Sequence, residues 1–169
     1  MGRNSGGLRV FYRQTSPKEE QFRRILNNKR VSGGEYDRRT GGYYLIESSR
    51  QKHKPEEIEA AKILAKNGYH VVLKDEAGIS TTVDGYISLL TYEQRTPSGD
   101  TPTNIRNSLF HGRDKKASYA VVYLGDKSGH TDETIISGIK LFEKATSYRF
   151  RKIIVVRKNG SVKEYRHTK

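Results

Sequence analysis

The pattern of apolar and polar positions along the chain predicts helices that alternate with short strands. Four segments carry apolar residues at helical spacing, and most open with the Pro, Ser or Thr typical of a helix start. Shorter apolar or alternating runs are typical of strands. The predicted helices begin near residues 16, 55, 103 and 131, and the predicted strands cover 43–46, 69–74, 82–87, 91–97, 118–124, 152–157 and 162–165. Because helices connect several of these strands, we expect an α/β fold: a single domain with a mixed central sheet and flanking helices.

The region before residue 55 differs in character from the rest of the chain. Its start, up to Gln14, is rich in glycine and basic residues, and 27–42 is a polar stretch with many turn formers. We therefore predict that 1–54 is a basic N-terminal extension with a short helix and one strand, and that 55–169 is the main domain. The Asn159-Gly160 pair predicts a hairpin that brings 162–165 back antiparallel to the strand before it.

Composition and net charge limit the classes of function that the protein can have. The 169 residues carry a formal net charge of +13, with 33% hydrophobic residues and a mean hydropathy of −0.83. Such an excess favours a polyanionic partner, most often nucleic acid, although a merely soluble basic protein would look similar. The sequence has no cysteine, which excludes disulfides and thiolate zinc sites. No apolar run is long enough to span a membrane and no signal peptide is recognisable, so we expect a cytoplasmic site of action without membrane attachment.

Two carboxylates in neighbouring strand-like runs are the main candidates for chemistry. Asp84 lies in 82–87 and Glu93 in 91–97, and strand alternation places Glu93 and Arg95 on one face. If the two runs pair, the carboxylates come close together and repel each other unless a divalent cation or a shared proton intervenes. This arrangement suits a magnesium site for phosphoryl chemistry. The alternative is a turn aspartate and an exposed strand glutamate in an ordinary ion pair with Arg95.

Further charged residues surround this candidate site in the sequence. Glu57 lies in the first turn of the predicted helix at 55, where it either stabilises the helix dipole or points at the metal site as a third acid. The five histidines show no close ligand pair. The helix near 103 carries a group of basic residues that could grip a phosphate backbone or simply form a solvated face. This group consists of Arg106, His111, Arg113, Lys115 and Lys116.

The order of these elements resembles the PD-(D/E)xK nuclease core. More narrowly, 105–123 and 150–160 resemble the C-terminal nuclease domains of contact-dependent growth inhibition (CdiA) toxins, which are largely tRNA-cleaving. The likeness covers about 55–165. It implies a metal-dependent endonuclease that acts on RNA in preference to DNA, delivered from a donor cell as part of a larger toxin and neutralised by an immunity protein.

The resemblance also implies roles for individual residues. Asp84 and Glu93 would bind Mg²⁺ or Mn²⁺ with the backbone carbonyl of Gln94, and Glu57 would match the acid of the family's first helix. Arg95 stands where the family usually has lysine; a guanidinium can stabilise phosphate charge but cannot act as a general base. Two alternatives stay open: a catalytically weak nucleic-acid-binding module, and a DNA-cleaving enzyme of a mobile element.

Overall fold

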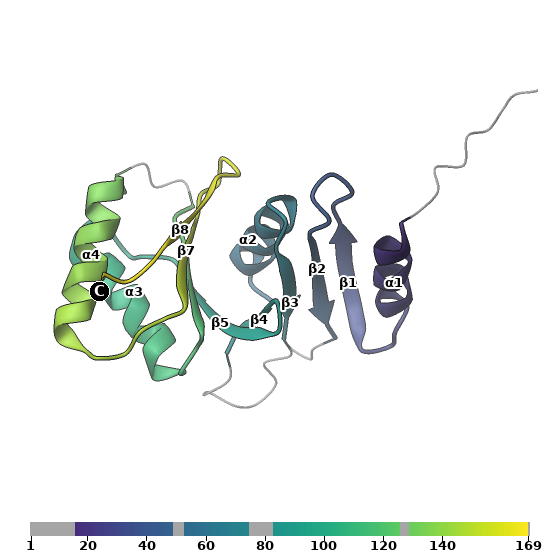
Figure 1. Cartoon of the computed structure of the whole chain (residues 1–169), viewed down its shortest axis with the longest axis horizontal. Coiled ribbons are helices and arrows are strands. Elements are labelled where there is room, and N and C mark those ends of the chain that lie inside the picture. The colour runs from purple at the N-terminus through teal and green to yellow at the C-terminus, as the bar shows by residue number, and fades with distance from the viewer. Residues whose placement is uncertain (1–15, 49–52, 75–82, 126–128, 169) are drawn as a thin grey trace, which may run out of the picture.

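A twisted sheet of eight strands runs through the whole molecule in the computed structural model, which describes residues 16–48, 53–74, 83–125 and 129–168 (Figure 1). The predicted α/β class is confirmed. The helices are α1 (Pro17–Leu26), α2 (Pro55–Lys66), α3 (Pro102–Asp114) and α4 (Asp132–Ala145). The strands are β1 (Val31–Tyr36), β2 (Tyr43–Glu47), β3 (His70–Leu73), β4 (Gly85–Ile87), β5 (Leu90–Arg95), β6 (Tyr119–Tyr123), β7 (Lys152–Val156) and β8 (Val162–Tyr165).

The strands lie in the sheet in the same order as in the sequence. β2 and β3 are parallel, as are β5, β6 and β7, and a helix connects each parallel pair. The other neighbours are antiparallel. The predicted hairpin of β7 and β8 is confirmed, with Val156 opposite Val162. Parallel neighbours need a crossover, which explains why helices and strands alternate in the sequence.

Helices cover both faces of the sheet, and each face has its own hydrophobic core. One core lies under α2, which packs on β2, β3 and β7 and whose Ala61 and Leu64 share a hydrophobic cluster with residues of these strands and of β6. The other lies under α3 and α4, where Ile105 and Phe142 pack against the opposite side of β6 and β7. Within β6, Val121 belongs to the α2 core and its neighbours to the α3–α4 core, as strand alternation requires.

The strand β1 was missed by the sequence prediction, which treated 27–42 as a turn-rich loop. Its sequence, VSGGEY, has two glycines and no apolar alternation, so it carries little intrinsic strand signal. Antiparallel pairing with β2 forms the strand instead. The chains approach closely there: a Cβ on Gly34 would lie 2.4 Å from the carbonyl oxygen of Tyr44. Tertiary pairing thus overrides weak local preference at this edge of the sheet.

A tight turn joins β4 to β5. Ser88 and Leu89 both have positive φ angles, 47° and 70°, as in the turns that suit the twist of a two-residue hairpin. Asn and Gly normally occupy these positions, because larger side chains are strained there. Leu89 is also 93% exposed. This apolar tip is therefore unfavourable both for backbone conformation and for solvation.

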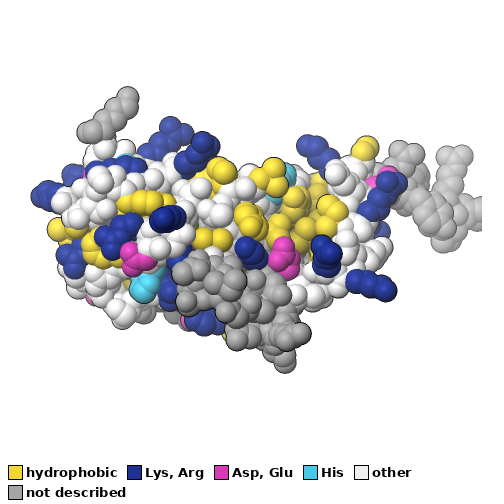
Figure 2. Space-filling model, turned by 90° about the horizontal axis from the view of Figure 1, so that it is seen from below, with side chains coloured by type: hydrophobic (Ala, Val, Ile, Leu, Met, Phe, Trp, Pro, Cys, Tyr) yellow, Lys and Arg dark blue, Asp and Glu magenta, His cyan; other side chains and the backbone are white. Residues whose placement is uncertain are grey.

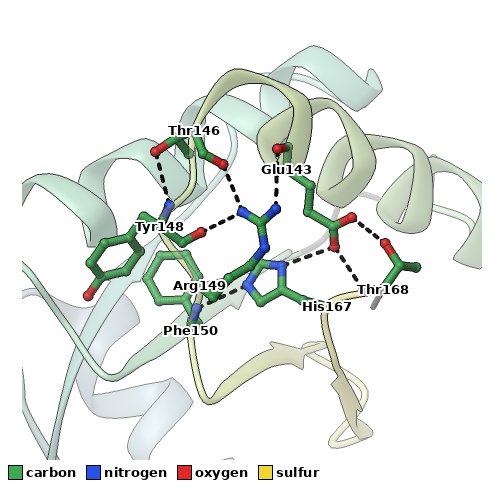
Figure 3. A network of polar contacts seen from close by, with 7 residues as sticks. All are labelled: Glu143, Thr146, Tyr148, Arg149, Phe150, His167 and Thr168. Atoms are coloured by element: carbon green, nitrogen blue, oxygen red, sulfur yellow. Dashed lines mark hydrogen bonds and ion pairs between the residues drawn. The ribbon is translucent and has the colours of Figure 1, made fainter.

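The C-terminal segment is held by a polar network around His167 (Figure 3). The Phe150 amide donates to Nε2 of His167 at 3.0 Å, and Nδ1 lies 3.0 Å from Oε1 of Glu143. Since a backbone amide must donate, Nε2 is unprotonated and Nδ1 carries the ring proton. Both Thr168 donors also contact Glu143. Burial lowers the pKa of His167, which favours the neutral ring that this network needs.

Some sequence predictions fall outside the described residues. These are the basic lead-in up to residue 14 and the first residue of the run 82–87. In the part of the chain that is described, no helix combines the length and apolar character needed to cross a membrane.

Candidate active site

Asp84 and Glu93 face each other across the hairpin of β4 and β5. Gly85 pairs with Tyr92 in the antiparallel register, so Asp84 and Glu93 take up the next pair of positions, on the opposite face from Tyr92. Both are buried, with exposed fractions of 6% and 2%. The Gln94 amide donates to Oδ2 of Asp84 at 2.6 Å. The strand pairing on which the predicted carboxylate pair depends is therefore present.

Two cations lie beside Glu93. Nζ of Lys115 is 3.0 Å from Oε1 of Glu93, and Nη2 of Arg95 is 3.5 Å from the same oxygen. Lys115 directly follows α3, which packs along β5 and β6. Sequence reasoning had placed Lys115 only in the group of phosphate-gripping residues. No spacing in the sequence links it to Glu93, because the packing of α3 on the sheet creates this contact.

The electrostatics of Glu93 differ from those of an ordinary strand glutamate. Burial and the nearby charge of Asp84 raise the pKa of Glu93 to about 7, against the opposing effect of Lys115 and Arg95. Two carboxylates close enough to raise each other's pKa are held together only at an energetic cost. Such raised values are typical of functional sites. The interpretation of Glu93 as an exposed residue in a weak surface ion pair is thus wrong.

Three consecutive residues of β5 each keep a buried polar atom without a hydrogen-bond partner among the described residues. They are Oε2 of Glu93, Oε1 of Gln94 and Nε of Arg95. Buried polar atoms in native proteins are nearly always satisfied, so a local concentration of unsatisfied ones is a place where water, an ion or a ligand binds. The Glu93 oxygen lies on the carboxylate face, where a cation would complete its coordination.

Glu57 belongs to a neighbouring network. Its Oε2 accepts from the Lys54 amide at 3.2 Å and lies 3.3 Å from Nδ1 of His53. Burial would raise the pKa of Glu57, but these contacts outweigh it and leave the pKa lowered. Among the described residues, no three His, Asp or Glu side chains gather as a metal-binding group. The site thus offers two carboxylates, and a role for Glu57 beside them stays a prediction.

The first turn of α2 is nevertheless attached to the strand that carries Glu93. Nε2 of Gln94 donates to the backbone carbonyl oxygen of Glu56 at 3.2 Å, and the Thr96 hydroxyl donates to the Glu56 carboxylate at 3.0 Å. Gln94 therefore connects two elements: its backbone N–H binds Asp84, and its side-chain amide binds the first turn of α2. Sequence reasoning had considered only its backbone carbonyl.

The predicted basic residues on α3 and just after it form two pairs, with Lys116 outside both. His111 and Lys115, one turn apart, lie on the side of the carboxylates: burial and the charge of Arg95 lower the pKa of His111. Arg106 and Arg113 instead stack over the ring of Phe110, at 5.6 and 4.5 Å from its centroid. Lys116 is exposed beyond the helix end. The first group can act at a bound phosphate, and the second forms a separate basic surface.

Comparison with known proteins identifies a similar fold. No family model and no curated protein matches the sequence. Among solved structures, the chain is similar to one from the "CdiA-CT/CdiI toxin and immunity complex from Burkholderia pseudomallei", with a TM-score of 0.55 and 22% sequence identity. The match covers 72% of this chain and 98% of that one. At this identity the likeness shows a shared fold, in agreement with the α/β architecture described above.

Proposed function

We propose that this protein is a metal-dependent phosphodiester hydrolase acting on nucleic acid, with RNA as the favoured substrate. One observation carries the proposal: the buried pair of Asp84 and Glu93, with Lys115 and Arg95 in contact with Glu93. A buried pair of carboxylates costs stability, and such costly pairs are typical of functional sites. The net charge of +13 supports a polyanionic substrate.

The residues present fit a hard divalent cation such as Mg²⁺ or Mn²⁺. Carboxylate oxygens are its preferred ligands, and Oε2 of Glu93 has no hydrogen-bond partner among the described residues. Asp84 and Glu93 would hold the ion, and the backbone carbonyl of Gln94 is a further candidate ligand. A divalent ion bound there would neutralise phosphate charge and lower the pKa of a coordinated water. Because the ion needs a deprotonated Glu93, its affinity should rise with pH through about 7.

Lys115 and Arg95 have complementary tasks in this proposal. Arg95 is permanently charged and can donate to the non-bridging oxygens of the scissile phosphate. Lys115 is a compact cation against Glu93 and supplies the lysine that β5 itself lacks. In the ion-free site it offsets the charge of Glu93, and with substrate bound it can stabilise charge that develops on phosphate oxygens. The arginine in the motif position is therefore compatible with activity.

The test is cleavage by the purified protein of tRNA, a single-stranded RNA and a DNA of the same sequence, with Mg²⁺ or with EDTA. We expect RNA cleavage with Mg²⁺ only, and loss of at least two orders of magnitude in Glu93→Gln. Glu133→Gln is the matched control, because Glu133 is an exposed acid in the first turn of α4. Equal cleavage by Glu93→Gln and wild type would refute the proposal. Salt-sensitive binding without cleavage under any metal would instead support a nucleic-acid-binding module.

We further propose that the chain is the toxic domain of a larger delivered protein, with an immunity protein as its partner. The shared fold with a chain of a toxin and immunity complex supports this. Expression of the chain inside bacteria should then arrest growth, and the Glu93→Gln variant should be tolerated. Equal growth of cells expressing either form would argue against a toxic role while leaving the hydrolase proposal to the cleavage test.

A further inference from the structure

The sheet face that carries Asp84 and Glu93 continues beyond the helices that cover it. α3 and α4 pack over β6 and β7 on this face, Phe22 of α1 contacts Tyr43 of β2, and no helix among the described residues covers β3 and β4 there. Tyr86 lies two residues after Asp84 in β4, so its side chain is on the same face at a spacing of roughly 7 Å. Hydrophobic side chains are exposed over this half of the molecule, with lysines and arginines around them (Figure 2). The candidate active site thus borders an uncovered apolar surface.

Two adjoining grooves run along this open face. One, with a volume of about 600 Å³, reaches the β4–β5 turn and is lined by Tyr43, Glu47, His70, Val72, Tyr86, Ser88 and Leu89. The other leads to α1 and includes Lys18, Phe22 and Tyr36. Both contain Tyr43 and His70, so they form one aromatic groove.

The aromatic rings of this groove include a stacked pair. Tyr43 and His70 stack with ring centroids 4.5 Å apart and planes at 9°. His70 is fixed in this position by contact of its Nε2 with the carbonyl oxygen of Gly41 at 3.1 Å, yet it remains exposed. Nζ of Lys74 lies 5.7 Å from the ring centre of Tyr86. The groove therefore combines one exposed and two half-buried rings with nearby positive charge, and Glu47 is the one acid among its described lining residues.

We propose that this aromatic groove binds unpaired bases of a single-stranded RNA segment whose backbone passes the Asp84–Glu93 pair. The inference rests on the proposed hydrolase function and specifies its substrate as RNA with unpaired nucleotides. Aromatic rings in a positively charged groove are the usual means of binding single strands, because every base has a π face. Continuity with the carboxylate pair on one sheet face favours nucleic acid over a protein as the occupant.

The turn at Leu89 supports an occupant of the groove. A leucine with φ of 70° and 93% exposure is costly in the free protein. Contact with a base would bury its side chain and recover part of that cost. Leu89→Asn should then relieve the backbone strain and keep or raise thermal stability, while single-strand binding weakens by a few fold.

The experiment measures RNA binding in the Glu93→Gln background, which prevents cleavage during the assay. A fluorescent single-stranded RNA, the same RNA in a duplex, and a single-stranded DNA are titrated at several salt concentrations. We expect the single-stranded RNA to bind at least tenfold more tightly than the duplex. Tyr86→Leu should weaken single-strand binding by roughly tenfold, and Tyr86→Phe should not, because only the phenylalanine keeps a π surface. His70→Ala, at an exposed position, provides a second test, and circular dichroism checks that each variant is folded.

The salt dependence of RNA affinity separates the contribution of base stacking from that of charge. Tyr86→Leu should leave the slope of log affinity against log salt unchanged, whereas Lys74→Gln should reduce it by about one. Unchanged binding in both Tyr86→Leu and His70→Ala, or equal affinity for single strand and duplex, would overturn the proposal. If those variants instead change self-association in sedimentation, the groove is a protein interface and the proposal is wrong. Cleavage of the same RNA by the wild type is measured separately. Failure of the base-binding proposal is therefore distinguishable from failure of the hydrolase proposal.

Discussion

Replacement of Glu93 by glutamine should stabilise the protein at the same time as it removes activity. Burial and the charge of Asp84 raise the pKa of Glu93 to about 7, so in the folded state the ionised form is disfavoured. Glutamine has nearly the same shape and cannot ionise. The variant therefore removes the repulsion while the hairpin and its packing are kept.

The magnitude follows from the shift in pKa between the unfolded and folded states. With an unfolded value near 4.5 and a folded value of about 7, the unfolded chain binds fewer protons between these values, so stability falls as pH rises through that window. The penalty that glutamine removes is about 1 kcal/mol at pH 5 and about 3 kcal/mol at pH 8. For a chain of this size, 3 kcal/mol corresponds to roughly 6–12 °C in melting temperature.

The assay is urea unfolding at pH 5 and pH 8 in EDTA, with both proteins followed by circular dichroism. Glu143→Gln is the contrasting control, because hydrogen bonds from Thr168 and His167 outweigh burial and lower the pKa of Glu143. That variant should lose about 1–3 kcal/mol at pH 8. A stability gain for Glu93→Gln that is absent at pH 8, or that does not grow from pH 5 to pH 8, would refute the idea of a desolvated, mutually repelling carboxylate pair.

Three further predictions concern the same site and the C-terminal network. Asp84→Asn should abolish Mg²⁺-dependent cleavage. It should also lower the pKa of Glu93, which a pH titration of Glu93 by carbon-13 NMR would show. An unchanged pKa of Glu93 would contradict the electrostatic interaction between Asp84 and Glu93. Lys115→Met should move the pH at which Mn²⁺ binds upward, because Lys115 favours the ionised Glu93, and calorimetry at several pH values checks this. The His167 pKa is lowered by burial, so His167 should cost the wild type stability as pH falls below about 6.5, and urea unfolding of His167→Gln should show a flatter pH dependence.

Residue order along the chain was enough to predict the class of fold and the two strands that carry the site. Helical and strand spacing, together with start and turn signals, predicted the four helices and seven of the eight strands, because these elements have local patterns. The alternation of β5 predicted that Glu93 and Arg95 share a face, and the two strand-like runs predicted that Asp84 meets Glu93 on the condition that the runs pair, which they do. These are consequences of residue order over a few positions.

Tertiary structure alone decided the rest. β1 exists because β2 pairs with it, and its own sequence carries almost no strand signal. Lys115 reaches Glu93 because α3 packs along β5 and β6, a contact between residues that no local pattern connects. The aromatic groove forms because, among the described elements, α3 and α4 cover only part of one sheet face. Burial, which raises the pKa of Glu93, is likewise a property of the packed molecule, since desolvation depends on the surrounding elements and not on the neighbours in sequence.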